Sequence, residues 1–146
     1  MKTTERMTDR GRITGALDRM HEETGVVWRG GGWTCCGTCG HYELTTELGE
    51  GASFVFWHAQ SDERAFGEEV RETITYTGYD EESGEEEEYD EEEFFTEVGD
   101  DLLSDLFIYH SDTVAASETV DALRRAGYEV EWDGSPREAI RVAASG

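Results

Sequence analysis

Apolar positions near the N-terminus repeat with the period of a helix. Residues Ile13, Leu17 and Met20 stand at positions i, i+4 and i+7 in a segment that is otherwise largely polar. This spacing predicts a helix over about 4–23 with one apolar side, and Gly25 follows it as a C-cap.

The C-terminal third predicts a strand, a helix and two further strands. "DLFIYH" (105–110) is a continuous apolar run typical of a buried strand, and the helical spacing of Ala116, Val120 and Leu123 predicts a helix over 114–126. Ser111, Asp112 or Thr113 can cap this helix, and Gly127 can end it. "YEVEW" (128–132) and "EAIRVAA" (138–144) then predict two strands joined by a turn. A crossover followed by an antiparallel edge strand is the expected topology.

The middle of the chain predicts shorter elements. "SFVFWHAQ" (53–60) indicates a strand ending near His58, and "ETITYTG" (72–78) alternates as a half-solvated strand does. We expect a short strand at 26–28, a short helix at 42–48 and a helix at 94–104. Together these elements predict a single α+β domain over 1–146, with a mixed, mainly antiparallel sheet of about five strands and packed helices.

Charge is the strongest compositional signal. The 146 residues include 35 acids against 12 bases, the only lysine is Lys2, and fourteen acids and no base lie in 80–101. We expect an acidic insertion at about 80–101, and no calcium-loop spacing can be laid on it. A net charge of −23 strains a compact fold by self-repulsion unless salt screens it, so the composition is typical of a salt-adapted, haloarchaeal-type protein. The alternative is a functional acidity directed at a basic partner.

The same composition excludes other classes of protein. Phosphate contacts need clustered Lys or Arg, so direct nucleic-acid binding is not expected. No apolar run approaches the length of a membrane helix, and the first residues, "MKTTERMTDR", lack the apolar region of a signal peptide. We therefore expect a cytoplasmic protein. An odd count of three cysteines disfavours a disulfide framework.

All three cysteines lie in "WTCCGTCGHY" (33–42), within a region rich in glycine. Cys36 and Cys39 have the C-x-x-C spacing of half a zinc knuckle, but the chain has no second C-x-x-C. Further ligands would come from Cys35, His41, His58 or His110, or from a carboxylate. His58 and His110 each end an aromatic strand, so they would share one sheet edge if those strands were parallel neighbours. We take Cys36, Cys39, His58 and His41 as the candidate zinc ligands.

Two other interpretations of the cysteines stay open. A thiol redox switch or thiol enzyme would use the C-x-x-C, although the surrounding acids disfavour a thiolate. Alternatively the cysteines are packing residues of a glycine turn, and the protein is an acidic interaction protein without a metal or catalytic site. Asp62 and Glu63 follow His58 closely and could be acid–base partners, but proximity carries little weight in so acidic a chain.

Three stretches resemble a prokaryotic family classified only as a domain of unknown function. They are "CCGTCG" (35–40), "FWHAQSDERA" (56–65) and "LRRAGYEVEWDGSPREAIRV" (123–142). The resemblance rests on a C-C-x-T-C-G motif and a C-terminal W-D-G motif. It implies a shared architecture and directs attention to Cys35, Gln60, Trp132, Asp133 and Gly134 beside the zinc candidates. In the second stretch, Ser61-Asp62 departs from the family's pattern, and His110 is not expected in relatives. The resemblance implies no mechanism.

Overall fold

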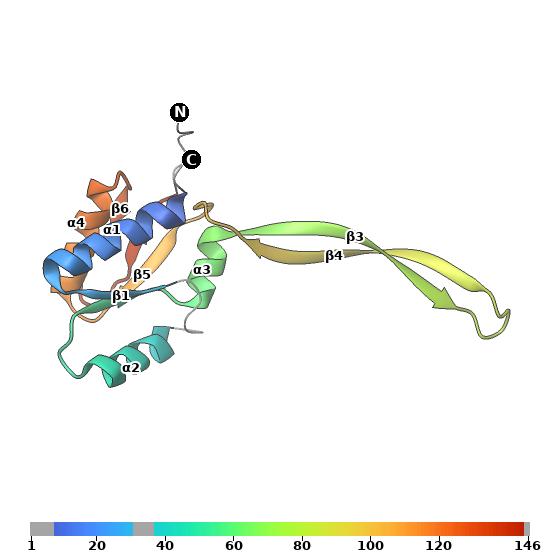
Figure 1. The fold of residues 1–146 in the computed structure, drawn as a ribbon, viewed down its shortest axis with the longest axis horizontal. Coiled ribbons are helices and arrows are strands. Elements are labelled where there is room, and N and C mark those ends of the chain that lie inside the picture. The colour runs from blue at the N-terminus through green and yellow to red at the C-terminus, as the bar shows by residue number, and fades with distance from the viewer. Residues whose placement is uncertain (1–7, 31–36, 145–146) are drawn as a thin grey trace, which may run out of the picture. The chain divides into compact units, whose positions relative to one another are not determined.

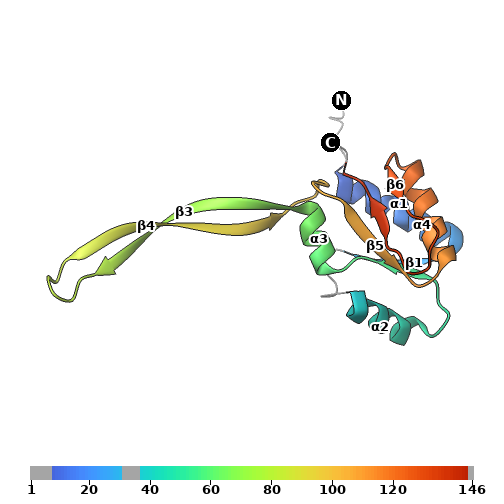
Figure 2. The same ribbon diagram turned by 180° about the vertical axis from the view of Figure 1, so that it is seen from behind.

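The computed structural model describes residues 8–30 and 37–144, which form two compact units (Figures 1 and 2). The first unit comprises residues 1–67 and 98–146, and the second comprises residues 68–97. The α+β class is confirmed. The predicted single domain over 1–146 with an acidic insertion stays a prediction. Within the described residues, no helix is long and apolar enough to span a bilayer.

A five-stranded mixed sheet forms the first unit, in the order β1-β2-β5-β7-β6. Its strands are β1 (Val27–Arg29), β2 (Phe54–Phe56), β5 (Leu106–His110), β6 (Val130–Glu131) and β7 (Ile140–Val142). The β1–β2 pair is parallel and the three other pairs are antiparallel, as the sequence predicts for a mainly antiparallel sheet. The last strand differs from prediction, because β7 lies between β5 and β6 and leaves β6 at the edge.

Helices cover both faces of this sheet. Figures 1 and 2 show α1 (Asp9–Thr24) and α4 (Thr113–Arg125) on one side and α2 (Gly37–Leu48) on the other. Alternation within β2 divides the core accordingly. Val55 joins the larger cluster with the apolar sides of α1 and α4, whereas Phe54 and Phe56 pack with Leu44 of α2. Helix α3 (Ala59–Phe66) contributes Ala65 and Phe66 to the larger cluster.

Capping residues set the ends of the two long helices. Thr8 caps α1 by accepting a hydrogen bond from the Gly11 N–H, and Gly25 ends it in the left-handed region at φ 80°. Among the three predicted caps of α4, Asp112 is the one used, because its carboxylate accepts from the Ala115 N–H at 2.7 Å. The apolar positions predicted for both helices are buried.

The second unit is a β-hairpin of β3 (Gly67–Tyr79) and β4 (Glu86–Val98). The helix predicted over 94–104 is therefore wrong: residues 94–98 are the end of β4, and residues 99–104 form neither helix nor strand. In a strand, Phe94 and Phe95 point to opposite sides, and both are exposed. After β4, Leu102 is buried in the core and Leu103 is exposed.

Candidate functional site

The predicted zinc ligands are only partly within the described residues. Cys35 and Cys36 lie outside them, so the structure leaves the C-x-x-C untested. Cys39 and His41 are exposed on the first turns of α2, and the His41 ring meets Phe54 edge-on with 5.3 Å between ring centroids. Among the described residues, no group of three or more His, Cys, Asp or Glu side chains could hold a metal ion.

His58 is buried and caps helix α3. Its Nδ1 accepts a hydrogen bond from the Ser61 N–H at 3.1 Å, while its Nε2 lies 3.4 Å from the Tyr109 hydroxyl. Desolvation by burial, with a smaller repulsion from Arg64, lowers the pKa of His58.

This geometry assigns the proton of the His58 ring. A backbone N–H can only donate, so Nδ1 has no proton and the neutral ring carries it on Nε2. Both nitrogens are therefore engaged, and binding a metal through His58 requires the ring to give up the helix cap.

His110 does not join His58, which corrects the expectation that the two share a sheet edge. β2 and β5 are neighbours but antiparallel, and Val55 stands opposite His110. His110 instead donates from Nε2 to the Glu138 carbonyl at 2.8 Å and meets Trp132 edge-on. Its Nδ1 is buried with no hydrogen-bond partner among the residues that the structure describes.

Of the remaining motif residues, Trp132, Asp133 and Gly134 belong to a turn, and Gln60 lies on a helix. Asp133 accepts from the Ser135 N–H at 2.8 Å, Gly134 has φ 85°, and Trp132 donates to the Ser135 carbonyl. A side chain at residue 134 would be strained in this conformation, so the W-D-G sequence matches the needs of the β6–β7 turn. Gln60 is exposed in the first turn of α3.

A pocket of about 460 Å³ lies where the parallel strands β1 and β2 end. Gly30 follows β1 and Trp57 follows β2, and both residues line it with Arg10 of α1 and Asp62 of α3. A Cβ at residue 30 would lie 2.2 Å from the Trp57 ring, so the close approach of this backbone requires glycine.

An ion pair closes one side of the pocket. Arg10 makes two hydrogen bonds to Asp62, at 2.7 and 3.1 Å, and Asp62 also accepts from the Trp57 indole at 2.9 Å. The Asp62 hydrogen bond raises the pKa of Arg10, which keeps the guanidinium charged. Since the carboxylate is satisfied from three directions, it fixes α1 and α3 to the sheet rather than offering a base to a substrate.

The hairpin is the second candidate site. Fifteen of its thirty residues are Asp or Glu and Arg71 is its only base, which gives a net charge of −14. Every residue of β4 is exposed. Because β3 and β4 form a two-stranded sheet, each strand also leaves the backbone groups of its outer edge unpaired.

Aromatic side chains are interleaved with these carboxylates. Tyr76 stacks on Tyr89 with centroids 5.6 Å apart and donates to Glu93 at 2.5 Å, which raises the pKa of Tyr76 to about 12. On the opposite side, the Arg71 guanidinium lies 5.1 Å from the Phe94 ring centroid. The hairpin already contains one cation held by an aromatic ring and a carboxylate, since Glu92 lies 4.0 Å from Arg71.

Residues 1–145 match the family model for a domain of unknown function, DUF6891, and the chain belongs to this family. The predicted resemblance is thereby confirmed as a match to a domain of unknown function. The signature motifs and the haloarchaeal type stay predictions. No curated protein and no solved structure matches the chain.

Proposed function

We propose that this member of the DUF6891 family is a cytoplasmic interaction protein whose acidic hairpin binds a basic protein partner. The observation that carries the proposal is a separate unit of net charge −14 with exposed aromatic rings. The partner is a protein segment rich in arginine or lysine, because its charge complements the hairpin.

The contacts of Arg71 support the binding mode. Within the hairpin, this arginine lies against Phe94 and near Glu92, so the same surface type can receive a partner's cation in the same way. Tyr79, Tyr89 and Phe95 are exposed aromatic residues that offer further rings beside carboxylates. Aromatic faces and carboxylates together bind guanidinium groups more strongly than exposed ion pairs alone.

The twenty acids outside the hairpin have a different role in this proposal. They are spread over the first unit against eleven bases, and we assign them to salt adaptation rather than to partner binding.

A deletion tests the role of the hairpin. The Gly99 N–H donates to the Phe66 carbonyl at 2.9 Å beside the first and last residues of the hairpin, so replacing 69–96 with Asn-Gly should leave the five-stranded sheet folded. A synthetic peptide of alternating arginine and glycine serves as the probe, titrated by calorimetry. We expect the deletion to weaken binding by about tenfold or more.

Two charge-matched variants complete the experiment. Glu86, Glu87 and Glu88 changed to glutamine should weaken peptide binding, whereas the same change at the exposed Glu22, Glu43 and Glu50 of the first unit should not. Equal losses from both triple variants would show that net charge alone binds the peptide and would contradict the proposal.

Zinc binding by Cys36 and Cys39 is the second candidate function. One observation favours it: β1 and β2 run parallel, so Gly30 and His58, which follow these strands, lie at the same edge of the sheet. Binding would require His58 to release the Ser61 N–H. Protein purified without chelator should then contain about one zinc per chain, and folded protein without zinc would exclude this candidate.

The thiol alternative has a separate test. If the C-x-x-C is an activated redox or catalytic thiol, its alkylation rate should rise with pH around a pKa clearly below the ordinary value of about 8.5. Alkylation with an ordinary pH profile would argue against activation.

A further inference from the structure

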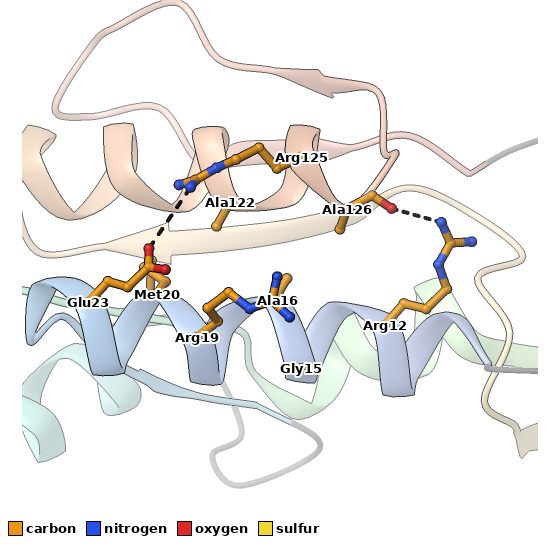
Figure 3. Close-up of a pocket in the computed structure, with 9 residues that line it drawn as sticks. All are labelled: Arg12, Gly15, Ala16, Arg19, Met20, Glu23, Ala122, Arg125 and Ala126. Carbon is orange, nitrogen blue, oxygen red and sulfur yellow. Dashed lines mark hydrogen bonds and ion pairs between the residues drawn. The ribbon is translucent and has the colours of Figure 1, made fainter.

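Helices α1 and α4 enclose a groove of about 310 Å³ on the first unit (Figure 3). Small residues create the space. Gly15 and Ala16 line it from α1, and Ala122 and Ala126 line it from α4. A Cβ built on Gly15 meets no atom within 4 Å, so the groove is open at this position.

Arginine side chains surround this apolar floor. Arg12 and Arg19 come from α1 and Arg125 comes from α4, so three of the chain's eleven arginines line one groove. Among the residues that the structure describes, Glu23 is the one acid that lines it. The groove therefore has a local excess of positive charge in a chain whose net charge is −23.

The three arginines differ in how firmly they are held. Arg12 donates to the Ala126 carbonyl at 2.7 Å, and its guanidinium lies 5.1 Å from the Tyr128 ring centroid. Within the described part of the chain, Arg125 makes a 3.9 Å ion pair with Glu23 and a hydrogen bond to the Asp121 carbonyl of its own helix. Arg19 has no hydrogen bond or ion pair with any residue that the structure describes. Figure 3 draws it reaching along α1 toward the turn of Ala16.

We propose that this α1–α4 groove binds a small amphipathic anion, a carboxylate or phosphate attached to a short apolar body. Arg19 binds the anionic group, and Arg125 adds a second contact when it leaves Glu23. The apolar body lies on the floor formed by Gly15, Ala16 and Ala122.

Size and charge both favour a small ligand of this kind. Pockets for small molecules begin at about 300 Å³, and the guanidinium fork matches carboxylate and phosphate geometry. The many acids elsewhere do not cancel the attraction, because the Debye length is about 8 Å at physiological salt. This site is separate from the hairpin surface, so neither proposal depends on the other.

Calorimetric titration of the full chain with four probes tests the ligand class. Octanoate and octyl phosphate carry both parts of the proposed ligand, octanol lacks the anion, and inorganic phosphate lacks the apolar body. We expect one or both of the amphipathic anions to bind about tenfold more tightly than octanol and inorganic phosphate. The better of the two identifies the anionic group. Equal binding of octanol, or of inorganic phosphate, would overturn the proposal.

Three variants locate the site. Arg19→Gln removes an arginine that has no hydrogen bond or ion pair with another described residue. Gly15→Leu fills the groove and favours the helix. Both should weaken binding of the tighter anion by about tenfold. Arg137→Gln removes the same charge from the exposed β6–β7 turn and should leave binding unchanged. If Arg19→Gln and Arg137→Gln bind the anion equally, the groove is not the site.

Discussion

Replacing Asp62 with asparagine should destabilise the first unit, which contains the five-stranded sheet, by about 2–4 kcal/mol. Asp62 accepts two hydrogen bonds from Arg10 and one from the Trp57 indole. Asparagine keeps the shape, but it removes the negative charge and, if it keeps the Trp57 bond, turns N–H groups toward the guanidinium. Removing one partner of a fully buried pair costs about 3–5 kcal/mol. The Asp62 side chain is 10% exposed and the Arg10 side chain is 23% exposed, so we expect a loss of stability below that of a fully buried pair.

Thermal unfolding followed by circular dichroism measures this loss. An unfolding entropy of about 2.1 cal/mol/K per residue, over roughly 115 residues, converts each kcal/mol into about 4 °C of Tm. The Asp62→Asn variant should therefore unfold about 8–16 °C below the parent protein in the same buffer.

Asp100→Asn is the matched control, because it removes a second carboxylate from the same arginine. Asp100 lies 3.3 Å from the Arg10 Nε, but its side chain is 65% exposed. This variant should lose less than about 1 kcal/mol, and the loss should disappear near 1 M salt. Equal losses for the two variants would refute the reasoning, since it attributes the whole difference to burial.

Three further predictions follow from particular residues. Gly30→Ala should destabilise the protein by about 1–3 kcal/mol, because its Cβ meets the Trp57 ring, whereas Gly15→Ala should stabilise it by up to about 1 kcal/mol; urea unfolding measures both. Stability should rise between about 0.1 and 1 M NaCl as repulsion is screened, and a constant unfolding free energy would contradict the predicted salt adaptation. Because the pKa of His58 lies below its ordinary 6.5, the unfolded chain binds more protons as pH falls through that value, and stability should decrease. His58→Asn keeps a capping side chain and should reduce this decrease; an unchanged pH profile would contradict the assignment.

Local sequence patterns predicted the elements whose apolar residues all pack against a single core. The apolar side of α4 and the alternation of "YEVEW" each describe one element packed on one core. The sequence did not predict β4, because its many acids leave no alternation of apolar and polar residues. Its backbone hydrogen bonds are made with β3, which a local pattern does not reveal. The antiparallel pairing of β2 and β5 was equally invisible, and with it the separation of His58 from His110.

The residues of the pocket show the same limit. Arg10 and Asp62 are 52 residues apart in the chain, so no motif connects them. Asp62 stood out only as an acid near His58, a weak signal among 35 acids. The need for glycine at residue 30 arises from Trp57, which reaches it through the parallel β1–β2 pair.

The lengths of the edge strands bear on aggregation. The five-stranded sheet ends in β1 and β6, which have three and two residues, so its edges offer little template for another chain. Both strands of the hairpin have thirteen residues and an unpaired edge, and there only carboxylates oppose strand addition. Changing the hairpin glutamates to glutamine removes that protection, because the unpaired strand edges then meet no charge repulsion. Fibres formed by such a variant should therefore be built from residues 67–98.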